Sequence, residues 1–162
     1  MNDFASSYVG QLRKLVGNRR LLVPGARIVI EDSRQRILLQ RRSDFGVWGL
    51  PGGNAEEGED LSDLVVREVR EETGLDVFDI EPFGFSSNPL LESFVYPNGD
   101  RTQHFSLNFF TRKYSGTLDA SDEESLELSW FSVGELPEML PNMRESISAY
   151  ERYVVTKLFQ LF

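Results

Sequence analysis

Three glutamates that could bind a metal ion stand close together in the segment from Arg67 to Glu72: Glu68, Glu71 and Glu72. Residues three and four positions apart are neighbours on the surface of a helix, so the spacing predicts one carboxylate cluster. Oxygen ligands of this kind favour a hard divalent cation, and we expect Mg²⁺ or Mn²⁺. The structural alternative is a charged helix face in solvent, in which Arg67 pairs with Glu71 four residues later. That pair would not satisfy all three acids.

The helix that must carry these acids is predicted from Leu61 to Thr73, with Asp60 as its N-cap and Gly74 at its end. At about 100° per residue its apolar residues define one face: Leu61, Leu64, Val65 and Val69. Glu68 and Glu72 project within this face, and Glu71 lies at its edge. Burial of an unpaired carboxylate is unfavourable, and adjacent acids raise one another's pKa. A cation between them would remove both penalties.

A glycine-rich loop, Gly46 to Glu59, comes immediately before this helix. Its segment Leu50-Pro51-Gly52-Gly53 predicts a tight turn, and two glycines allow the backbone to approach a ligand closely. A free carbonyl there could supply one more oxygen ligand. The alternative is an ordinary tight turn without a functional role.

Outside the loop and helix, the residues that could meet a phosphate are Arg41 and Arg42, which end a predicted strand. Side chains alternate along a strand, so one of the two should point inward, where it could bind phosphate through charge-assisted hydrogen bonds. A surface ion pair is the alternative for each arginine. The lone histidine, His104, is expected to be a structural strand residue.

The rest of the chain predicts helices and strands without internal repeats or linkers. A helix is expected over residues 3–16, from the spacing of Phe4, Tyr8, Leu12 and Leu15, with Gly17 as its stop. A closing helix is expected over roughly residues 143–160, from the stripe Ile147, Tyr150, Val154, Leu158 and Leu161. Strands are expected at 27–30, 36–41, 76–86, 103–113 and 126–132. This order predicts an α+β or layered α/β domain.

Composition limits the function classes. The chain has 162 residues, 40% of them hydrophobic and 27% charged, which suits one domain with its own core. Its 17 basic and 26 acidic residues give a net charge of −9, which disfavours nucleic acids and anionic membranes as partners. The absence of cysteine excludes disulfides, thiolate metal sites and cysteine nucleophiles, and it fits a cytoplasmic location. Neither a secretory signal nor a membrane span is expected.

The residues from Gly53 to Leu75 resemble the Nudix box, G-x5-E-x7-R-E-U-x-E-E-x-G-U, at every fixed position. Gly53, Glu59 and Gly74 occupy the fixed positions of the box outside its central segment. The flanks agree, since Trp48 to Gly53 is similar to the usual lead-in and Trp130-Phe131 with Glu135-Leu136-Pro137 is similar to the usual exit. The resemblance covers roughly residues 22–140 and indicates the Nudix (MutT-like) hydrolase family.

The resemblance implies an α+β fold, a Nudix-type α/β/α sandwich with a mixed β-sheet, together with N- and C-terminal helices. We expect residues 1–20 to form a helical extension and residues 21–162 to form a single Nudix domain. Family members use Mg²⁺ or Mn²⁺ to hydrolyse a nucleoside diphosphate linked to another group, of the nucleotide sugar, ADP-ribose or nucleoside triphosphate type. A nucleotide-type small molecule is therefore the expected partner, and a homodimer is the favoured assembly.

The resemblance also implies roles for individual residues. The implied metal ligands are Glu68, Glu71, Glu72 and the Gly52 carbonyl. Glu68 is also implied as the general base, with a role as a ligand only as the alternative. Arg67 is counted among the implied catalytic residues, but through an orienting role. Arg67 and Glu59 are expected to orient the helix and the loop rather than to take part in the chemistry. A further acid often precedes the last strand of the fold. In this sequence we choose Glu124 as that acid, with Glu123 as the alternative. The other interpretation is an acidic loop in solvent without a catalytic role.

Two other functions share this fold. A non-catalytic nucleotide-binding module or regulator usually has an interrupted box, whereas the box here is complete. An isomerase acting on isopentenyl diphosphate usually needs a cysteine, which the chain lacks. RNA decapping is disfavoured because the acidic chain offers no evident basic track. The box does not specify the substrate, and Pro89, near the place where ADP-ribose pyrophosphatases carry a proline, is a weak signal.

Overall fold

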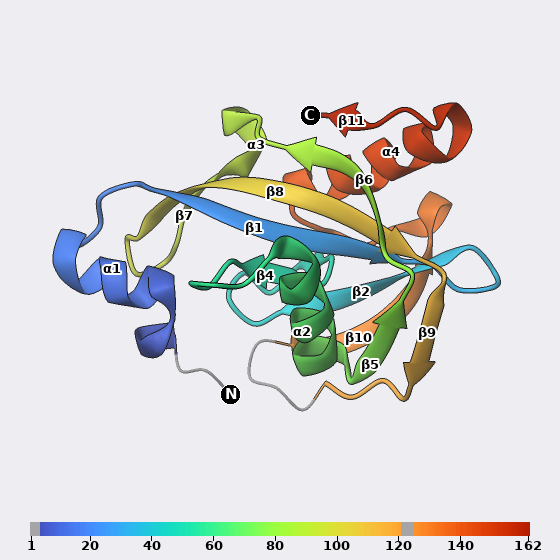
Figure 1. The fold of residues 1–162 in the computed structure, drawn as a ribbon, viewed down its shortest axis with the longest axis horizontal. Helices are drawn as coiled ribbons and strands as arrows, with labels where there is room; N and C mark the ends of the chain where they lie inside the picture. Colours follow the sequence, from blue (N-terminus) through green and yellow to red (C-terminus); the bar gives the residue numbers. More distant parts are fainter. Residues whose placement is uncertain (1–3, 121–124) are drawn as a thin grey trace.

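The computed structural model describes residues 4–120 and 125–162, which form a mixed sheet with helices on both faces (Figure 1). The helices are α1 (Tyr8–Val16), α2 (Leu61–Thr73), α3 (Pro89–Glu92) and α4 (Pro141–Thr156), with 3-10 turns η1 (Phe4–Ser6) and η2 (Val133–Glu135). The strands are β1 (Leu21–Ile30), β2 (Arg36–Arg42), β3 (Trp48–Gly49), β4 (Gly52–Asn54), β5 (Leu75–Phe78), β6 (Glu81–Ser86), β7 (Ser93–Val95), β8 (Arg101–Thr111), β9 (Lys113–Gly116), β10 (Ser125–Ser132) and β11 (Gln160–Leu161). Within these ranges no helix has both the length and the apolar character needed to cross a membrane.

The main sheet has the strand order β11-β6-β8-β1-β4, with β7 paired to β8. β1 and β8 run parallel, from Leu21 opposite Thr102 to Ile30 opposite Thr111. β4 runs antiparallel to β1 and places Gly52 beside Arg27. A second sheet, β10-β2-β3, and the pair β5-β9 contain the remaining strands. The glycine-rich turn is therefore attached directly to the edge of the main sheet.

Two apolar cores lie on the two faces of the sheet. Along β1, Ile28 and Ile30 belong to the core that α2 covers, whereas Val29 belongs to the core that α4 covers. Figure 1 shows α2 in front of the long strands and α4 toward their other side. Alternation along β1 thus separates two helical layers by one sheet. The predicted α/β/α sandwich with a mixed β-sheet is confirmed.

Two predicted strands are interrupted. The strand expected over residues 76–86 is divided into β5 and β6, because Asp79 takes a left-handed conformation with φ of 46°. The strand expected over residues 103–113 ends at Thr111, and β9 starts after a one-residue break. The Thr111 hydroxyl donates a 2.6 Å hydrogen bond to the Phe78 carbonyl, so both interruptions lie at the same corner. There the chain leaves the main sheet for the β5-β9 pair.

The closing helix is shorter than the sequence suggests. α4 ends at Thr156 because Lys157 is left-handed, with φ of 58°, and its amide donates to the Tyr153 carbonyl. The predicted stripe is therefore wrong at Leu158 and Leu161, which lie beyond the helix and are 67% and 80% exposed. The chain instead adds the short strand β11 beside β6.

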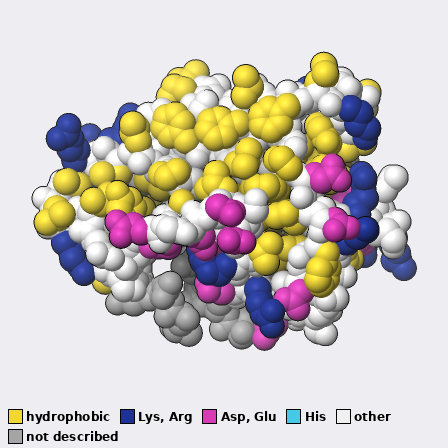
Figure 2. Space-filling view, in the orientation of Figure 1, with side chains coloured by type: hydrophobic (Ala, Val, Ile, Leu, Met, Phe, Trp, Pro, Cys, Tyr) yellow, Lys and Arg dark blue, Asp and Glu magenta, His cyan; other side chains and the backbone are white. Residues whose placement is uncertain are grey.

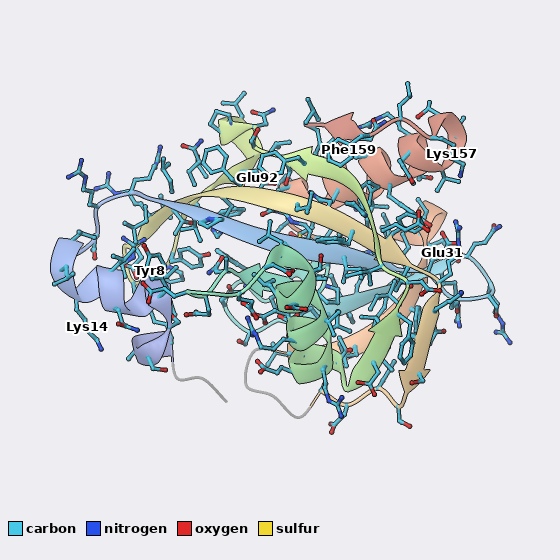
Figure 3. All side chains as sticks on the ribbon, in the orientation of Figure 1. Tyr8, Lys14, Glu31, Glu92, Lys157 and Phe159 are labelled. Carbon is cyan, nitrogen blue, oxygen red and sulfur yellow. The ribbon has the colours of Figure 1, made fainter. Side chains whose placement is uncertain are left out.

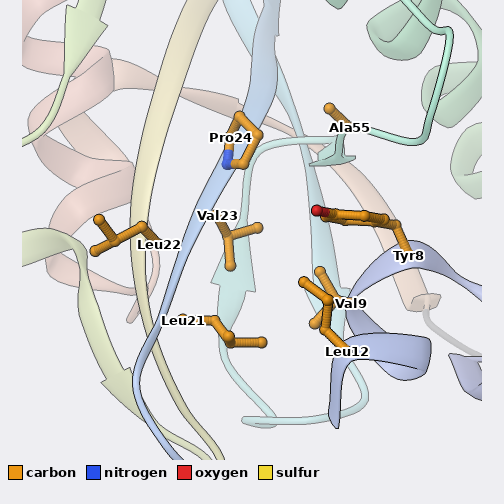
Figure 4. Close-up of a pocket in the computed structure, with 8 residues that line it drawn as sticks. All are labelled: Tyr8, Val9, Leu12, Leu21, Leu22, Val23, Pro24 and Ala55. Atoms are coloured by element: carbon orange, nitrogen blue, oxygen red, sulfur yellow. The ribbon is translucent and has the colours of Figure 1, made fainter. Parts of the chain in front are cut away.

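The N-terminal helix starts later than predicted, at Tyr8, because the Ser7 side chain caps it by accepting from the Gly10 amide. The predicted stripe is wrong at its two ends, since Phe4 lies before the helix and Leu15 is 82% exposed. Its middle residues, Tyr8 and Leu12, do face β1, beside the buried Val9. Figure 4 shows a small cleft where residues of α1 face β1 and the loop after β4, lined by Tyr8, Val9, Leu12, Leu21, Leu22, Val23, Pro24 and Ala55. α1 thus packs on the domain itself.

Candidate active site

Helix α2 has the bounds and the caps that the sequence predicts. The Asp60 carboxylate accepts hydrogen bonds of 2.7 and 3.0 Å from two amides of the first turn, and Gly74 ends the helix with φ of 74°. The apolar side chains Leu64, Val65 and Val69 are fully buried. Figure 2 shows acidic side chains gathered over α2 and the loop before it. The caps and the buried face together fix the direction in which each carboxylate projects.

Glu72 is buried between α2 and the glycine-rich turn, with only 2% of its surface exposed. Its Oε2 accepts a 2.9 Å hydrogen bond from the Gly52 amide. Burial and the nearby Glu68 raise the pKa of Glu72 to about 8, against the opposing effects of Gln40, Arg42 and the Gly52 amide. The groups around this carboxylate therefore supply too little positive charge to offset its burial.

Arg67 contacts three acidic side chains. It donates to the two oxygens of Glu59 at 2.7 and 3.0 Å, to Oε1 of Glu68 at 2.9 Å and to Oε2 of Glu71 at 3.5 Å. Hydrogen bonds from Arg67 hold the pKa of Glu59 below its ordinary value, although burial acts the other way. The bidentate contact joins the loop to the helix, a geometry compatible with an orienting role for both residues.

The turn before α2 has no room for side chains. A Cβ on Gly53 would lie 2.2 Å from Oε1 of Glu68. A Cβ on Gly52, whose φ is 150°, would lie 2.3 Å from the Ala26 carbonyl oxygen. The two glycines therefore bring backbone directly against the acidic side chains. The sequence pointed to the carbonyl of Gly52, but its amide contact with Glu72 was missed, because donors in a turn leave no signal in the sequence.

The residues present fit a hard divalent cation by their chemistry. In residues 4–120 and 125–162, no three acidic or histidine side chains converge closely enough to hold a metal ion directly. Glu68 and Glu71 contact Arg67 instead. A buried carboxylate beside a second carboxylate is nevertheless a place where a cation would stabilise both. Glu68, Glu71, Glu72 and the Gly52 carbonyl form an all-oxygen set suited to Mg²⁺ or Mn²⁺, and their ligand role remains a prediction.

Two buried polar residues that the sequence analysis did not select are Gln40, which acts on the pKa of Glu72, and Ser125, which contacts Gln40. Gln40 is fully buried in β2, and the Ser125 hydroxyl donates to its Oε1 at 2.6 Å. The Gln40 amide favours the ionised form of Glu72 and so lowers the pKa of that carboxylate. A signal for Gln40 exists in the sequence, since it follows the apolar run Ile37-Leu38-Leu39, where a buried polar side chain needs a partner.

The two arginines at the end of β2 have different surroundings. Arg41 forms an ion pair with Glu127 at 3.3 Å on an exposed part of the surface. Arg42 donates to both oxygens of Asp44, at 3.0 and 2.7 Å, and its charge lowers the pKa of Glu72. Arg42 is therefore the arginine that faces the candidate site, and phosphate binding by either residue remains a prediction.

An aromatic cluster lies near Arg42. The rings of Phe45, Phe94 and Tyr96 have centroids 5.3 to 6.5 Å apart. Burial raises the pKa of Tyr96, and the charge of Arg42 acts in the opposite direction. His104 packs edge-on against Phe94 at 5.6 Å. This contact fits the structural role expected for the histidine.

One predicted site residue has no position to report. Glu124, the choice for a further acid, and its alternative Glu123 lie outside the described residues. Ser125, the next residue, is the first residue of β10 and is buried beside Gln40.

Comparisons with known proteins bear on the family and the fold of this chain. The family model described as NUDIX domain matches residues 21–150. The chain is 29% identical over 161 residues to an ADP-ribose pyrophosphatase of Methanocaldococcus jannaschii, covering 94% of this chain and 90% of the relative. It is 34% identical over 135 residues to the NAD-capped RNA hydrolase NudC of Pseudomonas putida, covering 81% of this chain but only 44% of that protein. A MutT NUDIX hydrolase structure from Burkholderia pseudomallei, 24% identical, has a TM-score of 0.66 over 80% of this chain and 98% of that chain.

Proposed function

Because the chain belongs to the Nudix family and is a pyrophosphohydrolase of that family, we propose that it uses Mg²⁺ or Mn²⁺ to cleave a nucleoside diphosphate linked to another group. The observation that carries this proposal is the buried Glu72, which the Gly52 amide contacts beside Glu68. Such a carboxylate is stabilised when a cation binds it.

The proposed ligands are Glu68, Glu71, Glu72 and the Gly52 carbonyl. When bound, the cation supplies positive charge to the diphosphate and makes water easier to deprotonate. Glu72 serves as the buried anchor of the set. Glu68, held by Arg67 at 2.9 Å, is the proposed base that takes a proton from the attacking water. In hydrolysis the water oxygen bonds to one phosphorus of the diphosphate, the bond from that phosphorus to the bridging oxygen breaks, and the other phosphate leaves with the bridging oxygen.

ADP-ribose is the first substrate to test, because the Methanocaldococcus jannaschii relative named ADP-ribose pyrophosphatase matches nearly the whole of both chains. Nucleotide sugars and nucleoside triphosphates, which also contain a nucleoside diphosphate linked to another group, are tested next. Arg42 faces the site and is the proposed contact for a phosphate, for which it would have to leave Asp44. The NAD-capped RNA hydrolase matches over less than half of its length, so RNA comes last in the panel.

A panel of these nucleotides, incubated with Mg²⁺, with Mn²⁺ and with chelator, tests the proposal through release of AMP or phosphate. We expect Glu68→Gln to lose a factor of at least ~10² in kcat, the low end for a general base. Glu72→Gln should weaken Mn²⁺ binding in calorimetry. The matched control is Glu57→Gln, because Glu57 is an exposed glutamate in the glycine-rich loop before α2. This variant should have the kcat and the Mn²⁺ affinity of wild type. A folded chain that binds nucleotides but hydrolyses none would support the non-catalytic module instead.

We also propose a homodimer. Figure 2 shows a broad band of hydrophobic side chains over the sheet, and the exposed apolar residues include Leu22, Phe159 and Leu161. A second copy that covered such surface would remove apolar area from water. A monomer in light scattering would contradict this assembly. The cytoplasmic location also remains a prediction, which fractionation of the source cells would test.

A further inference from the structure

The connecting segment, residues 55–60, joins β4 to α2. At its start, the Ala55 amide donates to a carbonyl of β1 at 3.0 Å. Near its end, both carboxylate oxygens of Glu59 accept hydrogen bonds from Arg67 of α2. Residues 57–58 between these points are exposed. The position of the middle of the segment therefore depends on the contacts of the residue before them, Glu56.

Glu56 joins this segment to α1. Its Oε2 accepts a 2.9 Å hydrogen bond from the backbone amide of Tyr8, the first residue of that helix. Amides in the first turn of a helix have no partner within the helix, and a carboxylate there also meets the positive end of the helix dipole. The Ser7 side chain satisfies a second amide of the turn, that of Gly10. The start of α1 is thus completed by a residue 48 positions later in the chain.

Helix α1 is itself attached to the main sheet, so it can support the connecting segment. Val9 is buried where α1 meets β1, and Tyr8 and Ala55 line the same small cleft (Figure 4). Near the other end of the helix, the Arg13 guanidinium donates to the Arg101 carbonyl of β8 at 2.5 Å. The helix therefore extends from the start of β8 to the connecting segment.

From Glu56, hydrogen bonds continue to the proposed general base. The Glu59 amide donates to the Glu56 carbonyl at 3.2 Å, and the Glu56 amide donates to Oε2 of Glu59 at 3.4 Å. Glu59 accepts from Arg67, which in turn donates to Oε1 of Glu68 at 2.9 Å. A displacement of Glu56 would therefore be transmitted through two residues to Glu68.

We propose that Glu56 is a positioning residue through which α1 holds the connecting segment, and with it Glu68, in the place that catalysis requires. This inference rests on the proposed function, because Glu68 is the base proposed there. Glu56 acts through Glu59 and Arg67 and needs no contact with the cation or the substrate. It gives a role to α1, which lies outside the residues 21–150 that match the family model.

Glu56→Ala removes the acceptor of the Tyr8 amide. We expect kcat for the best nucleotide of the panel to fall by about 10-fold, less than the loss of about 10²-fold that direct misplacement by about 1 Å can cause. KM should change less than kcat, because Arg42, the proposed phosphate contact, lies in β2. Glu56→Gln keeps an oxygen acceptor and should lose less kcat than Glu56→Ala. Glu57→Ala, the same substitution at the exposed neighbouring glutamate, is the matched control and should keep the kcat of wild type.

Tyr8→Pro removes the donor of the same hydrogen bond without a change in the connecting segment. Proline is tolerated at the first position of a helix, and Ser7, with φ of −64° and ψ of 158°, already has the conformation that a residue before proline prefers. Tyr8→Ala loses the same ring but keeps the amide, so it is the matched control. We expect kcat of Tyr8→Pro to be about 10-fold below that of Tyr8→Ala. Glu56→Ala should add little to Tyr8→Pro, because both changes break one contact.

Hydrogen exchange of the backbone amides measures the contact apart from activity. In Glu56→Ala we expect exchange to be at least about 10-fold faster across residues 8–11 and across residues 56–59, because a hydrogen bond to a charged group is lost. A carboxylate that served only to cap α1 would leave residues 56–59 at the wild-type rate. Melting curves establish that each variant is folded at the temperature of the assay.

The outcomes separate this inference from the proposed function. If folded Glu56→Ala keeps the kcat of an active wild type, the inference is wrong and the proposed function stands. If Glu56→Ala does not fold, equal kcat in Tyr8→Pro and Tyr8→Ala overturns the inference. If wild type hydrolyses no nucleotide, the proposed function fails, and unchanged exchange of residues 56–59 in Glu56→Ala then overturns the support by α1 as well.

Discussion

The amide of Gly52 donates a 2.9 Å hydrogen bond to Oε2 of Glu72, which lies 20 positions further along the chain. Gly52 is at the same time paired with Arg27 of β1. The carboxylate at the end of α2 is therefore attached to the edge of the main sheet through a single glycine. Any change that moves this turn is expected to move the candidate site with it.

Gly53→Ala tests how closely the turn positions Glu68. The new Cβ would lie 2.2 Å from Oε1 of Glu68, so that side chain must move, whereas the backbone around it need not. We expect kcat to fall by about 10²-fold, as misplacement by about 1 Å can cause, with little change in melting temperature. Gly134→Ala is the control, because nothing lies within 4 Å of its added Cβ. Unchanged kcat in Gly53→Ala would show that the position of Glu68 is not critical.

Arg67→Lys tests the connection between loop and helix. Lysine keeps the charge but cannot make the bidentate contact with Glu59 while also reaching Glu68. We expect a loss of about 1 kcal/mol or more in the free energy of unfolding, measured by denaturant titration, together with lower kcat. Arg70→Lys on the exposed face of α2, where Arg70 pairs with Asp76, should change neither. If Arg67→Lys and wild type have equal free energies of unfolding, the Arg67 contacts contribute no more to stability than a surface ion pair does, and the prediction is wrong.

Arg13→Met tests how α1 is attached. The Arg13 guanidinium donates to the carbonyls of Gly17, Arg19 and Arg101, at 3.1, 2.6 and 2.5 Å. Without the Arg13 guanidinium, α1 should be attached mainly by its apolar contacts and by the hydrogen bond from the Tyr8 amide to the Glu56 carboxylate. Hydrogen exchange of the backbone amides should therefore accelerate across residues 8–16. Lys14→Met, which removes one bond to the Ala5 carbonyl, is the control. Exchange at wild-type rates in Arg13→Met would contradict this role.

The helix α2 could be predicted from the sequence because its signals are local. Asp60 caps it, Gly74 ends it, and the spacing of Leu64, Val65 and Val69 defines its buried face. The same pattern placed Glu72 among apolar residues, where the structure buries it.

The contacts behind the site could not be predicted, because they join distant segments. Ser125 and Gln40 are separated by 85 positions and meet only when β10 pairs with β2. The interruptions at Asp79 and Lys157 were also missed, because left-handed residues other than glycine carry no strong local signal. Exposed Leu158 and Leu161 extended the apparent helical stripe beyond its true end.

His104 lies on the sheet face opposite α2, beside a buried ion pair. Arg27 of β1 contacts Glu92 of α3 at 2.8 Å, and Glu92 is labelled in Figure 3. Burial, and then the positive charge of Arg27, lower the pKa of His104 to about 4, while Glu92 acts in the opposite direction and Arg42 adds to the lowering. The histidine is therefore neutral in the folded chain at neutral pH.

This shift predicts a loss of stability in acid. The folded pKa of His104, about 4, is below the ordinary value of 6.5, so between these pH values the unfolded chain binds a proton that the folded chain excludes. Stability is complete above pH 6.5 and declines as the pH falls toward 4, by up to about 2 kcal/mol between pH 6.5 and 5. His104→Gln removes this term, so its melting temperature should fall less than that of wild type between pH 7 and 5. Parallel melting curves for the two chains across this range would show that His104 is protonated in the folded state as readily as in the unfolded one.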